Sequence, residues 1–316
     1  KELSSRFLDA PTVVLEGLDN PGLLEKQEVL KQELLALAGT NNVTFSNAVP
    51  YNGSGRGHHI SAVQGDQSQD FDMNLESVDY DFISAFDINL IAGRDFDKSI
   101  AGDLFKADAE QVNVIVNELI IEKLGYGSPE NALGKPFYRV NQEGENNPPR
   151  EYRIIGVMKD QYFYGTHSDI PPMALYVNPE VFSFVSIRLN PTMVNESLND
   201  IEVVWKDIVH NYPMKRQFLE FYFNLFFRFP EGINNVLGAF ASVALSLALF
   251  GLFGLAAFLA QRRTKEIGIR KVMGASIQQI VRLLIWQFSK PVFWSLVVAV
   301  PLAYFASSMY LNFFPE

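Results

Sequence analysis

The sequence contains no cysteine, which excludes disulfide bonds, thiolate metal ligands and cysteine nucleophiles. It also lacks a Walker-type phosphate loop, because Gly53–Gly57 has neither the required lysine nor a following apolar helix. The four histidines have no zinc-helix spacing, and His58 and His59 end a glycine-rich stretch, 50–59, that we expect to be a flexible, solvated loop. The residues by themselves therefore predict no enzyme, no metal site and no bound cofactor.

Charge is absent from two long stretches near the C-terminus. Val236–Ala260 holds 25 residues without a charged side chain, and as a helix it would extend about 37 Å, enough to cross a ~30 Å hydrocarbon layer. A second uncharged stretch of 19 residues runs from Pro291 to Met309. We predict transmembrane helices at 236–260 and 291–311.

Positive charge is scarce in the large N-terminal part and concentrated between the two apolar stretches. Residues 261–290 carry seven of the 26 basic side chains and one of the 36 acidic ones, and Glu316 is also acidic, which leaves 19 basic and 34 acidic residues in 1–235. Short basic loops stay in the cytoplasm, so residues 1–235, with a net charge of −15, are expected outside it. That sign also excludes a nucleic-acid partner.

Export of the large acidic part requires a targeting segment. The N-terminal residues from Lys1 to Gly17 contain no apolar core of a signal peptide. We therefore expect the chain to be a fragment, with a transmembrane helix preceding Lys1 in the whole protein.

Strand and helix patterns alternate irregularly in residues 1–235. We predict a strand at 12–18, a helix at 23–37, a helix at 193–209 with one apolar stripe, and a last strand at 218–223. Because no strict strand–helix–strand rhythm is present, the pattern predicts an α+β extracytoplasmic domain that can comprise two subdomains.

The basic segment between the apolar stretches contains two predicted amphipathic helices. In the first, Ile269, Val272 and Met273 form a small apolar face among charged side chains, a pattern suited to a partner's groove. In the second, 277–288, apolar residues recur at helical spacing and Trp286 is placed at the depth of lipid headgroups, with a bend expected at Pro291. The alternative is a surface connector whose charges only orient the helices and bind anionic lipid.

Residues 263–275 resemble a conserved segment of the FtsX-like permease family, which includes MacB-type ABC transporters. The family pattern, close to R-x-x-E-I-G-I-R-[KRM]-x-x-G-A, is matched by the following residues: Arg263, Glu266, Ile267, Gly268, Ile269, Arg270, Lys271, Gly274 and Ala275. Three segments of the outer part, Ile88–Asp97, Ala132–Phe137 and Arg153–Asp160, look like motifs of MacB-like periplasmic core domains.

The resemblance implies a permease subunit in a bacterial inner membrane, with its MacB-like domain in the periplasm and an inserted subdomain near 105–178. It implies that a separate ABC ATPase binds ATP and docks on the short cytoplasmic helix, through Arg263, Lys265, Glu266, Ile267, Gly268, Ile269, Arg270, Lys271, Met273, Gly274 and Ala275. Family members have four transmembrane helices per module and pair as dimers or pseudo-dimers, and some engage a periplasmic adaptor.

Two functions follow from this resemblance and from the residues. In the first, ATP-driven movement of the partner is passed along the helix at 236–260 to the outer domain (mechanotransmission), for export of peptides, antibiotics or lipoproteins. In the second, the chain is a membrane-anchored sensor or regulator that signals to an extracytoplasmic partner without transport. An importer is less favoured, because neither apolar stretch contains a charge or a broken helix that would mark a substrate path.

Overall fold

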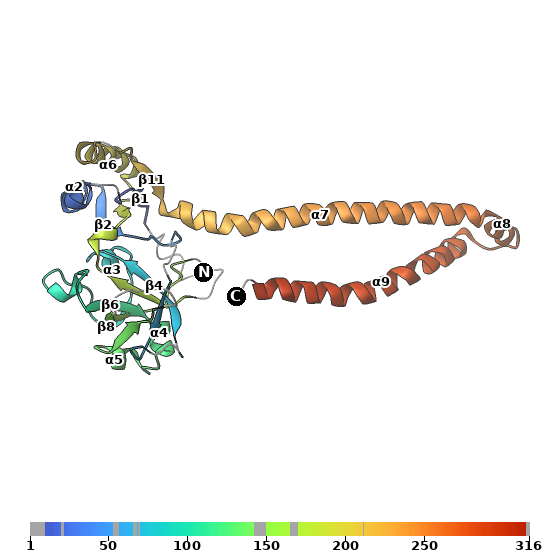
Figure 1. The fold of residues 1–316 in the computed structure, drawn as a ribbon. Coiled ribbons are helices and arrows are strands. Elements are labelled where there is room, and N and C mark those ends of the chain that lie inside the picture. The colour runs from blue at the N-terminus through green and yellow to red at the C-terminus, as the bar shows by residue number, and fades with distance from the viewer. Residues whose placement is uncertain are drawn as a thin grey trace. The chain divides into compact units, whose positions relative to one another are not determined.

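The computed structural model describes residues 10–19, 22–52, 57–65, 68, 70–141, 150–164, 170–210 and 212–313 (Figure 1). It divides into two compact units, Lys1–Phe226 and Phe227–Glu316. The described strands all belong to the first unit, and the described part of the second unit consists of helices. The predicted α+β class of the outer part is confirmed.

A four-stranded antiparallel sheet has the strand order β11–β1–β10–β2. Its strands are β1 (Thr12–Glu16), β2 (Thr40–Ser46), β10 (Phe184–Leu189) and β11 (Lys215–Phe218). Helices α2 (Gln27–Leu35) and α6 (Val194–Ile208) share a hydrophobic cluster with these strands. In α6, Ile201 and Trp205 are four residues apart on one helix face and both are buried, as the apolar stripe predicts.

Seven further strands form a sheet that closes on itself. They are β3 (Gly57–Ser61), β4 (Phe71–Ser77), β5 (Leu90–Gly93), β6 (Gln111–Asn117), β7 (Pro136–Arg139), β8 (Glu151–Met158) and β9 (Met173–Tyr176). The order β5–β8–β6–β9–β4–β3–β7 is completed by a pairing of β7 with β8. Six strands, from β8 round to β7, therefore form a closed barrel to which β5 is added. Short helices α3 (Phe82–Ala85), α4 (Glu118–Lys123) and α5 (Pro129–Ala132) lie between these strands in the sequence.

Strand β8 is the point at which the three outer motifs of the sequence meet. One edge pairs with β6 along its length, while the other edge is shared by β7 at its start and β5 at its end. Gly93 in β5 lies opposite Gly156 in β8, and a Cβ on Gly93 would lie 2.3 Å from the carbonyl oxygen of Ile155. The backbone amide of Gly134, from the motif Ala132–Phe137, donates to the Ile154 carbonyl. Glycine at position 93, with φ of +80°, permits this close approach.

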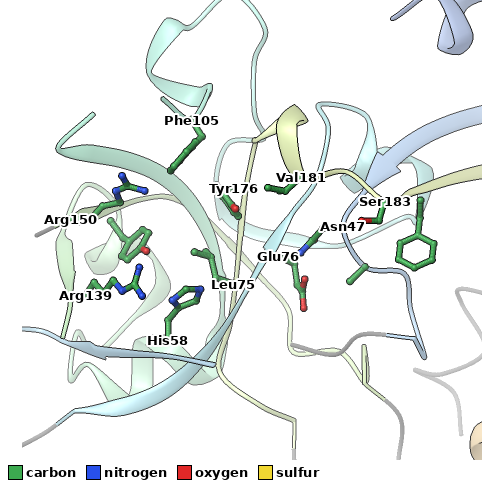
Figure 2. A pocket seen from close by; sticks show the side chains of 13 residues that line it. Asn47, His58, Leu75, Glu76, Phe105, Arg139, Arg150, Tyr176, Val181 and Ser183 are labelled. Carbon is green, nitrogen blue, oxygen red and sulfur yellow. The ribbon is translucent and has the colours of Figure 1, made fainter. Parts of the chain in front are cut away.

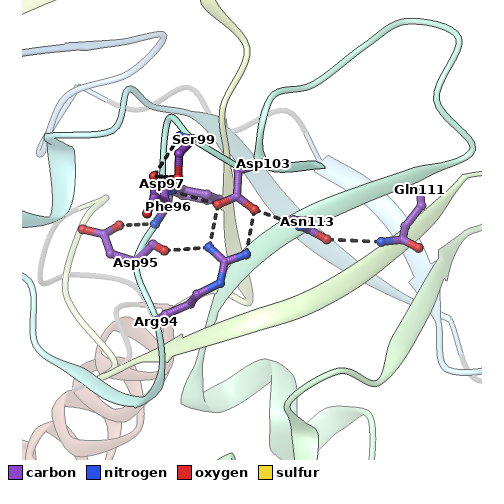
Figure 3. Close-up of polar contacts among 8 residues, drawn as sticks. All are labelled: Arg94, Asp95, Phe96, Asp97, Ser99, Asp103, Gln111 and Asn113. Atoms are coloured by element: carbon purple, nitrogen blue, oxygen red, sulfur yellow. Dashed lines mark hydrogen bonds and ion pairs between the residues drawn. The ribbon is translucent and has the colours of Figure 1, made fainter. Parts of the chain in front are cut away.

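A polar network fixes the turn that follows β5 (Figure 3). Arg94 makes a two-pronged contact with Asp103, Nη1 to Oδ2 at 2.5 Å and Nη2 to Oδ1 at 2.9 Å. Asp103 also accepts from Asn113 Nδ2 at 2.8 Å and from the backbone amide of Asp97 at 2.9 Å. Its side chain is fully buried. The turn is thereby tied to β6, where Asn113 resides.

The start of helix α7 (Leu219–Arg262) is part of the outer core. Leu219 and Tyr222 are buried in a cluster that also contains residues of both sheets. The Tyr222 hydroxyl donates to Glu16 at 2.6 Å, and the Phe223 ring meets Tyr51 edge to face at 5.0 Å between centroids. Side-chain packing therefore fixes the first turns of α7 to the outer core, in addition to the direct chain connection to β11.

Three local predictions differ from the structure. The predicted last strand at 218–223 is wrong, because helix α7 begins at Leu219 and buries residues three apart rather than alternate ones. The helix predicted at 23–37 is shorter, with a 3₁₀ turn at Leu24–Lys26 before α2. The histidines of the predicted loop 50–59 lie instead in strand β3, where they pair with β4, while residues 53–56 lie outside the described residues.

The second unit contains the rest of α7, then α8 (Thr264–Val272) and α9 (Ile277–Phe313). Within α7, Asn235–Phe258 is long and apolar enough to cross a membrane, with 24 residues, a mean hydropathy of 2.3 and no buried part. It is the single such helix among the described residues. Apolar residues Phe293–Met309 in α9 are shorter, so the second predicted span remains a prediction.

Candidate functional site

The predicted partner-binding segment folds as a short, exposed helix between two long ones. Arg263 occupies the position before α8, Met273 the position after it, and Gly274 and Ala275 follow; the residues inside the helix are Lys265, Glu266, Ile267, Gly268, Ile269, Arg270 and Lys271. No residue of α8 is buried. The structure thus brings all the predicted residues onto one helix and its two ends, while their docking role remains a prediction.

The apolar face of α8 is open. Ile269, Val272 and Met273 are 62%, 90% and 82% exposed, which is unusual for three neighbouring large apolar side chains. A soluble surface rarely leaves such groups clustered without a use. The charged side chains beside them are also accessible, and among the described residues no ion pair joins Glu266 to Arg270. The apolar face and the charged side of α8 are therefore both accessible to a partner.

The charge order along α8 suits its own dipole. Glu266 lies in the first turn, and Arg270 and Lys271 lie in the last turn. Acidic groups at the N-terminal end and basic groups at the C-terminal end each stabilise a helix by about 0.3–1 kcal/mol. The same charges present an acidic end and a basic end to any partner, which would fix the direction in which α8 binds.

The C-terminal end of α8 is a Schellman motif. The Ala275 amide donates to the Arg270 carbonyl at 3.0 Å, and the Gly274 amide donates to the Lys271 carbonyl at 3.2 Å. This geometry needs a left-handed residue, and Gly274 supplies it with φ of +88°. The glycine of the sequence motif therefore ends the helix, whereas Gly268 lies within it.

The next helix begins at once through a capping box. Ser276 Oγ accepts from the Gln279 amide at 3.3 Å, and Gln279 Oε1 accepts from the Ser276 amide at 3.1 Å. Neither residue was predicted as a cap, although a serine followed three positions later by glutamine before an apolar run is the signature of this motif. The link between α8 and α9 is thus short and fixed by hydrogen bonds at both ends.

Helix α9 is continuous where the sequence predicts two elements. It runs from Ile277 through Pro291 to Phe313, so the predicted interface helix and the predicted span form one helical segment. Proline lacks the amide that would bond to the preceding turn and kinks or breaks many helices, whereas membrane helices tolerate it because neighbouring groups bond the freed carbonyl. Near the start of α9, Arg282, Ile285 and Trp286 border a surface depression, and the two apolar side chains are more than half exposed.

Comparison with protein families gives one match to this region. Residues 238–315 match the family model described as FtsX-like permease C-terminal. The match covers α8, its flanking link and most of both long helices. The resemblance predicted from residues 263–275 is confirmed over this wider segment. A search of curated proteins gave no match.

Comparison with solved structures gives matches to periplasmic and extracellular domains and to a permease domain. The periplasmic region of MacB from Actinobacillus actinomycetemcomitans is similar at 14% identity and a TM-score of 0.42, covering 67% of this chain and 90% of that one. The extracellular domain of the noncanonic ABC-type transporter YknZ from Gram-positive bacteria is similar at 17% identity and a TM-score of 0.42, covering 66% of this chain and 99% of that one. A domain of a permease protein from Porphyromonas gingivalis is similar at 15% identity and a TM-score of 0.41, covering 66% of this chain and 88% of that one.

Proposed function

We propose that this chain is the permease subunit of an FtsX-like ABC transporter and that α8 is the surface on which a separate ATPase docks. The observation that carries the proposal is the match of residues 238–315 to the FtsX-like permease family. The chain contains no ATP-binding loop of its own, so ATP is bound and hydrolysed by the partner. This chain supplies the contact, not the catalysis.

Docking uses the two open faces of α8. Ile269, Val272 and Met273 enter a groove of the ATPase, which removes their apolar surface from water. Glu266 and Arg270 set the direction and specificity of binding. Hydrogen bonds at Gly274–Ser276 hold α8 at a fixed angle to α9, so that movement of one helix also moves the other.

Mechanotransmission along α7 is the proposed output. The helix is continuous from Leu219 to Arg262, and its first turns are held in the outer core by Leu219 and Tyr222. Movement of α8 therefore reaches the outer unit through packed side chains at the end of the helix. Asn235–Phe258 crosses the bacterial inner membrane, and a second span in α9 makes the protein multi-pass, with the large unit in the periplasm.

Export of peptides, antibiotics or lipoproteins is the proposed outcome of this movement, with a permease dimer or pseudo-dimer as the working form and a periplasmic adaptor as a further partner. The sensor or regulator function stays as the alternative. It would use the same outer unit and the same membrane helix but would not require an ATPase on α8, and this difference makes α8 the place to test.

The test uses the absence of cysteine. Met273→Cys gives the chain a single reactive thiol on an 82% exposed position of α8, which can be cross-linked to a neighbouring protein in intact membranes. We expect a cross-link to a protein that binds ATP, identified by mass spectrometry. The charge exchange Glu266→Lys with Arg270→Glu leaves the net charge unchanged and should abolish the cross-link. Arg282→Glu, a reversal on the exposed start of α9, is the control and should retain it.

Membrane insertion of each variant is verified by flotation with lipid vesicles. A cross-link to an ATPase that survives the charge exchange would place the contact elsewhere than α8. If Met273→Cys captures no ATP-binding protein from membranes in which the ATPase is present, the permease proposal fails and the sensor function takes its place.

A further inference from the structure

A cavity of about 460 Å³ lies at one end of the outer barrel (Figure 2). Strand register explains why this end is polar. Arg139 in β7 lies opposite buried Ile60, and His58 lies two residues from Ile60 on the same strand face. Ile60 belongs to the apolar cluster that fills the barrel. The same inner face that is apolar along most of the barrel therefore ends in a guanidinium and an imidazole.

A second guanidinium is held in place beside the first. Arg150 lies 4.6 Å above the ring of Phe105 and donates from Nη2 to the carbonyl of Ala107 at 3.1 Å. Arg139 has no carboxylate partner among the described residues. Figure 2 shows Arg139, Arg150 and His58 gathered on one side of the cavity. Burial raises the pKa of nearby Tyr152, and both guanidinium groups oppose that rise.

Aromatic side chains form part of the remaining wall, beside aliphatic and polar ones. Phe105 and Tyr176 meet edge to face with 5.5 Å between ring centroids, and Tyr152 stacks on Phe137 at 5.2 Å. The acidic group of the cavity, Glu76, lies apart from the arginines in Figure 2, and it accepts a hydrogen bond from Tyr164 at 2.5 Å. A cavity of this size, with aromatic and aliphatic side chains beside a few convergent polar groups, is a candidate small-molecule site.

We propose that this cavity binds a small organic acid, with its carboxylate between Arg139 and Arg150 and its apolar body against Phe105 and Tyr176. Guanidinium groups bind carboxylates in a two-pronged geometry that adds specificity to charge. A monoanion fits better than a phosphate dianion because the buried carboxylate of Glu76 also lines the cavity, and its negative charge repels a dianion more strongly. The site lies in residues 1–235, whose net charge is −15, so the local positive charge is a property of this cavity and not of the surface around it.

Binding is measured by isothermal titration calorimetry on the full chain in lipid nanodiscs, with empty nanodiscs as the reference for partition into lipid. The probes are N-acetylphenylalanine, its neutral amide and phenyl phosphate. We expect the carboxylate to bind, the amide to bind at least about tenfold more weakly, and the affinity for the carboxylate to fall as salt rises. Equal binding of acid and amide, preference for the phosphate, or no binding of the acid would overturn the proposal.

Variants locate the site. Arg139→Gln and Arg150→Gln should each weaken binding of the acid about tenfold or more, since each removes a charge-assisted hydrogen bond. Arg153→Gln is the matched control: it removes the same charge from β8, but Arg153 is exposed and pairs with Glu151 at 2.8 Å. Arg139→Lys keeps the positive charge but loses the planar guanidinium that makes two parallel hydrogen bonds, so this variant should bind the acid with intermediate affinity. Equal losses in Arg153→Gln and Arg139→Gln would show a general charge effect and refute the site.

Binding of an acid in the barrel cavity does not depend on the ATPase partner. Cross-linking through α8 and titration of the barrel cavity use different units of the chain, so either proposal can fail while the other stands. Amide hydrogen exchange in β7 and β8 verifies that each arginine variant is folded before its affinity is interpreted.

Discussion

Replacement of Arg94 by methionine is expected to lower the free energy of unfolding of the outer unit by about 2–3 kcal/mol. Asp103 has a fully buried side chain and accepts four hydrogen bonds, two of them from Arg94. Loss of one partner of a buried ion pair costs about 3–5 kcal/mol, because the remaining charge stays buried without its counter-charge. The Arg94 side chain is 40% exposed, so water already weakens the pair and the expected cost falls below that range, to about 2–3 kcal/mol.

The effect should depend on pH in a definite direction. Burial raises the pKa of Asp103, but hydrogen bonds from Arg94, Asn113 and the Asp97 amide outweigh it and leave the pKa below its ordinary value. A lowered carboxyl pKa contributes stability that is present above about pH 4 and is lost as the pH falls through the folded value. In Arg94→Met burial dominates and the pKa rises. The stability difference between wild type and variant should therefore be largest near pH 7 and shrink as the pH falls toward ~4.

Hydrogen exchange of β6 amides, measured by mass spectrometry on the full chain in detergent, provides the assay. A loss of about 2–3 kcal/mol corresponds to roughly 30- to 150-fold faster exchange of the slowest amides. Adding Asp103→Asn to Arg94→Met removes the unpaired charge and should restore most of the protection. Arg153→Met, on an exposed pair of the same barrel, should cost less than about 1 kcal/mol. A cost below ~1 kcal/mol for Arg94→Met, or no recovery in the double variant, would refute this account of the network.

Three further substitutions test other parts of the structure. Leu219→Ala removes a fully buried side chain at the start of α7 and should cost about 2–5 kcal/mol, measured as a lower Tm of the outer unit; an unchanged Tm would mean that the helix is not anchored there. Gly156→Ala places a Cβ 2.5 Å from the Arg94 carbonyl oxygen and should cost about 1–3 kcal/mol by the same measurement, whereas full tolerance would contradict the close approach of β5 and β8. Gly274→Val forces a branched side chain onto a backbone with φ of +88°, which costs about 1–2 kcal/mol. Hydrogen exchange of the amides at positions 274–276 should become faster, while exchange in the barrel stays the same. Unchanged exchange at positions 274–276 would exclude the Schellman geometry.

Local chemistry made much of the structure predictable. The stripe of α6 follows from apolar residues at helical spacing, and both Ile201 and Trp205 are buried as expected. The uncharged stretch 236–260 predicts a long apolar helix, and Asn235–Phe258 is helical and apolar enough to cross a membrane. In both segments the local pattern is strong enough to specify a helix by itself, so tertiary contacts do not override it.

Other features depend on contacts between distant residues. The stretch 218–223 is rich in aromatic residues, which are common in strands, but Leu219 and Tyr222 are buried in the outer core from one face of a helix instead. Closure of the barrel requires β7 to pair with both β3 and β8, and no local pattern specifies that choice. His58, Arg139 and Arg150 are far apart in sequence, so their convergence became visible only with the strand register. The sequence placed His58 in solvent, whereas it lines the cavity.

Closure of the barrel also decides where another chain could attach by adding a strand. An open sheet ends in a row of unpaired amide and carbonyl groups that can recruit a further strand, including one from a misfolded neighbour. Here the six strands of the ring satisfy one another, and the end of β8 beyond β7 is covered by the four-residue strand β5. In the four-stranded sheet, the outer edge of β2 is bonded at its end, where Ser46 bridges to Val78, while no described strand pairs with it at Thr40–Thr44. Strand exchange between copies, or capture of an extended peptide by backbone pairing, would therefore begin at the start of β2 and not in the barrel.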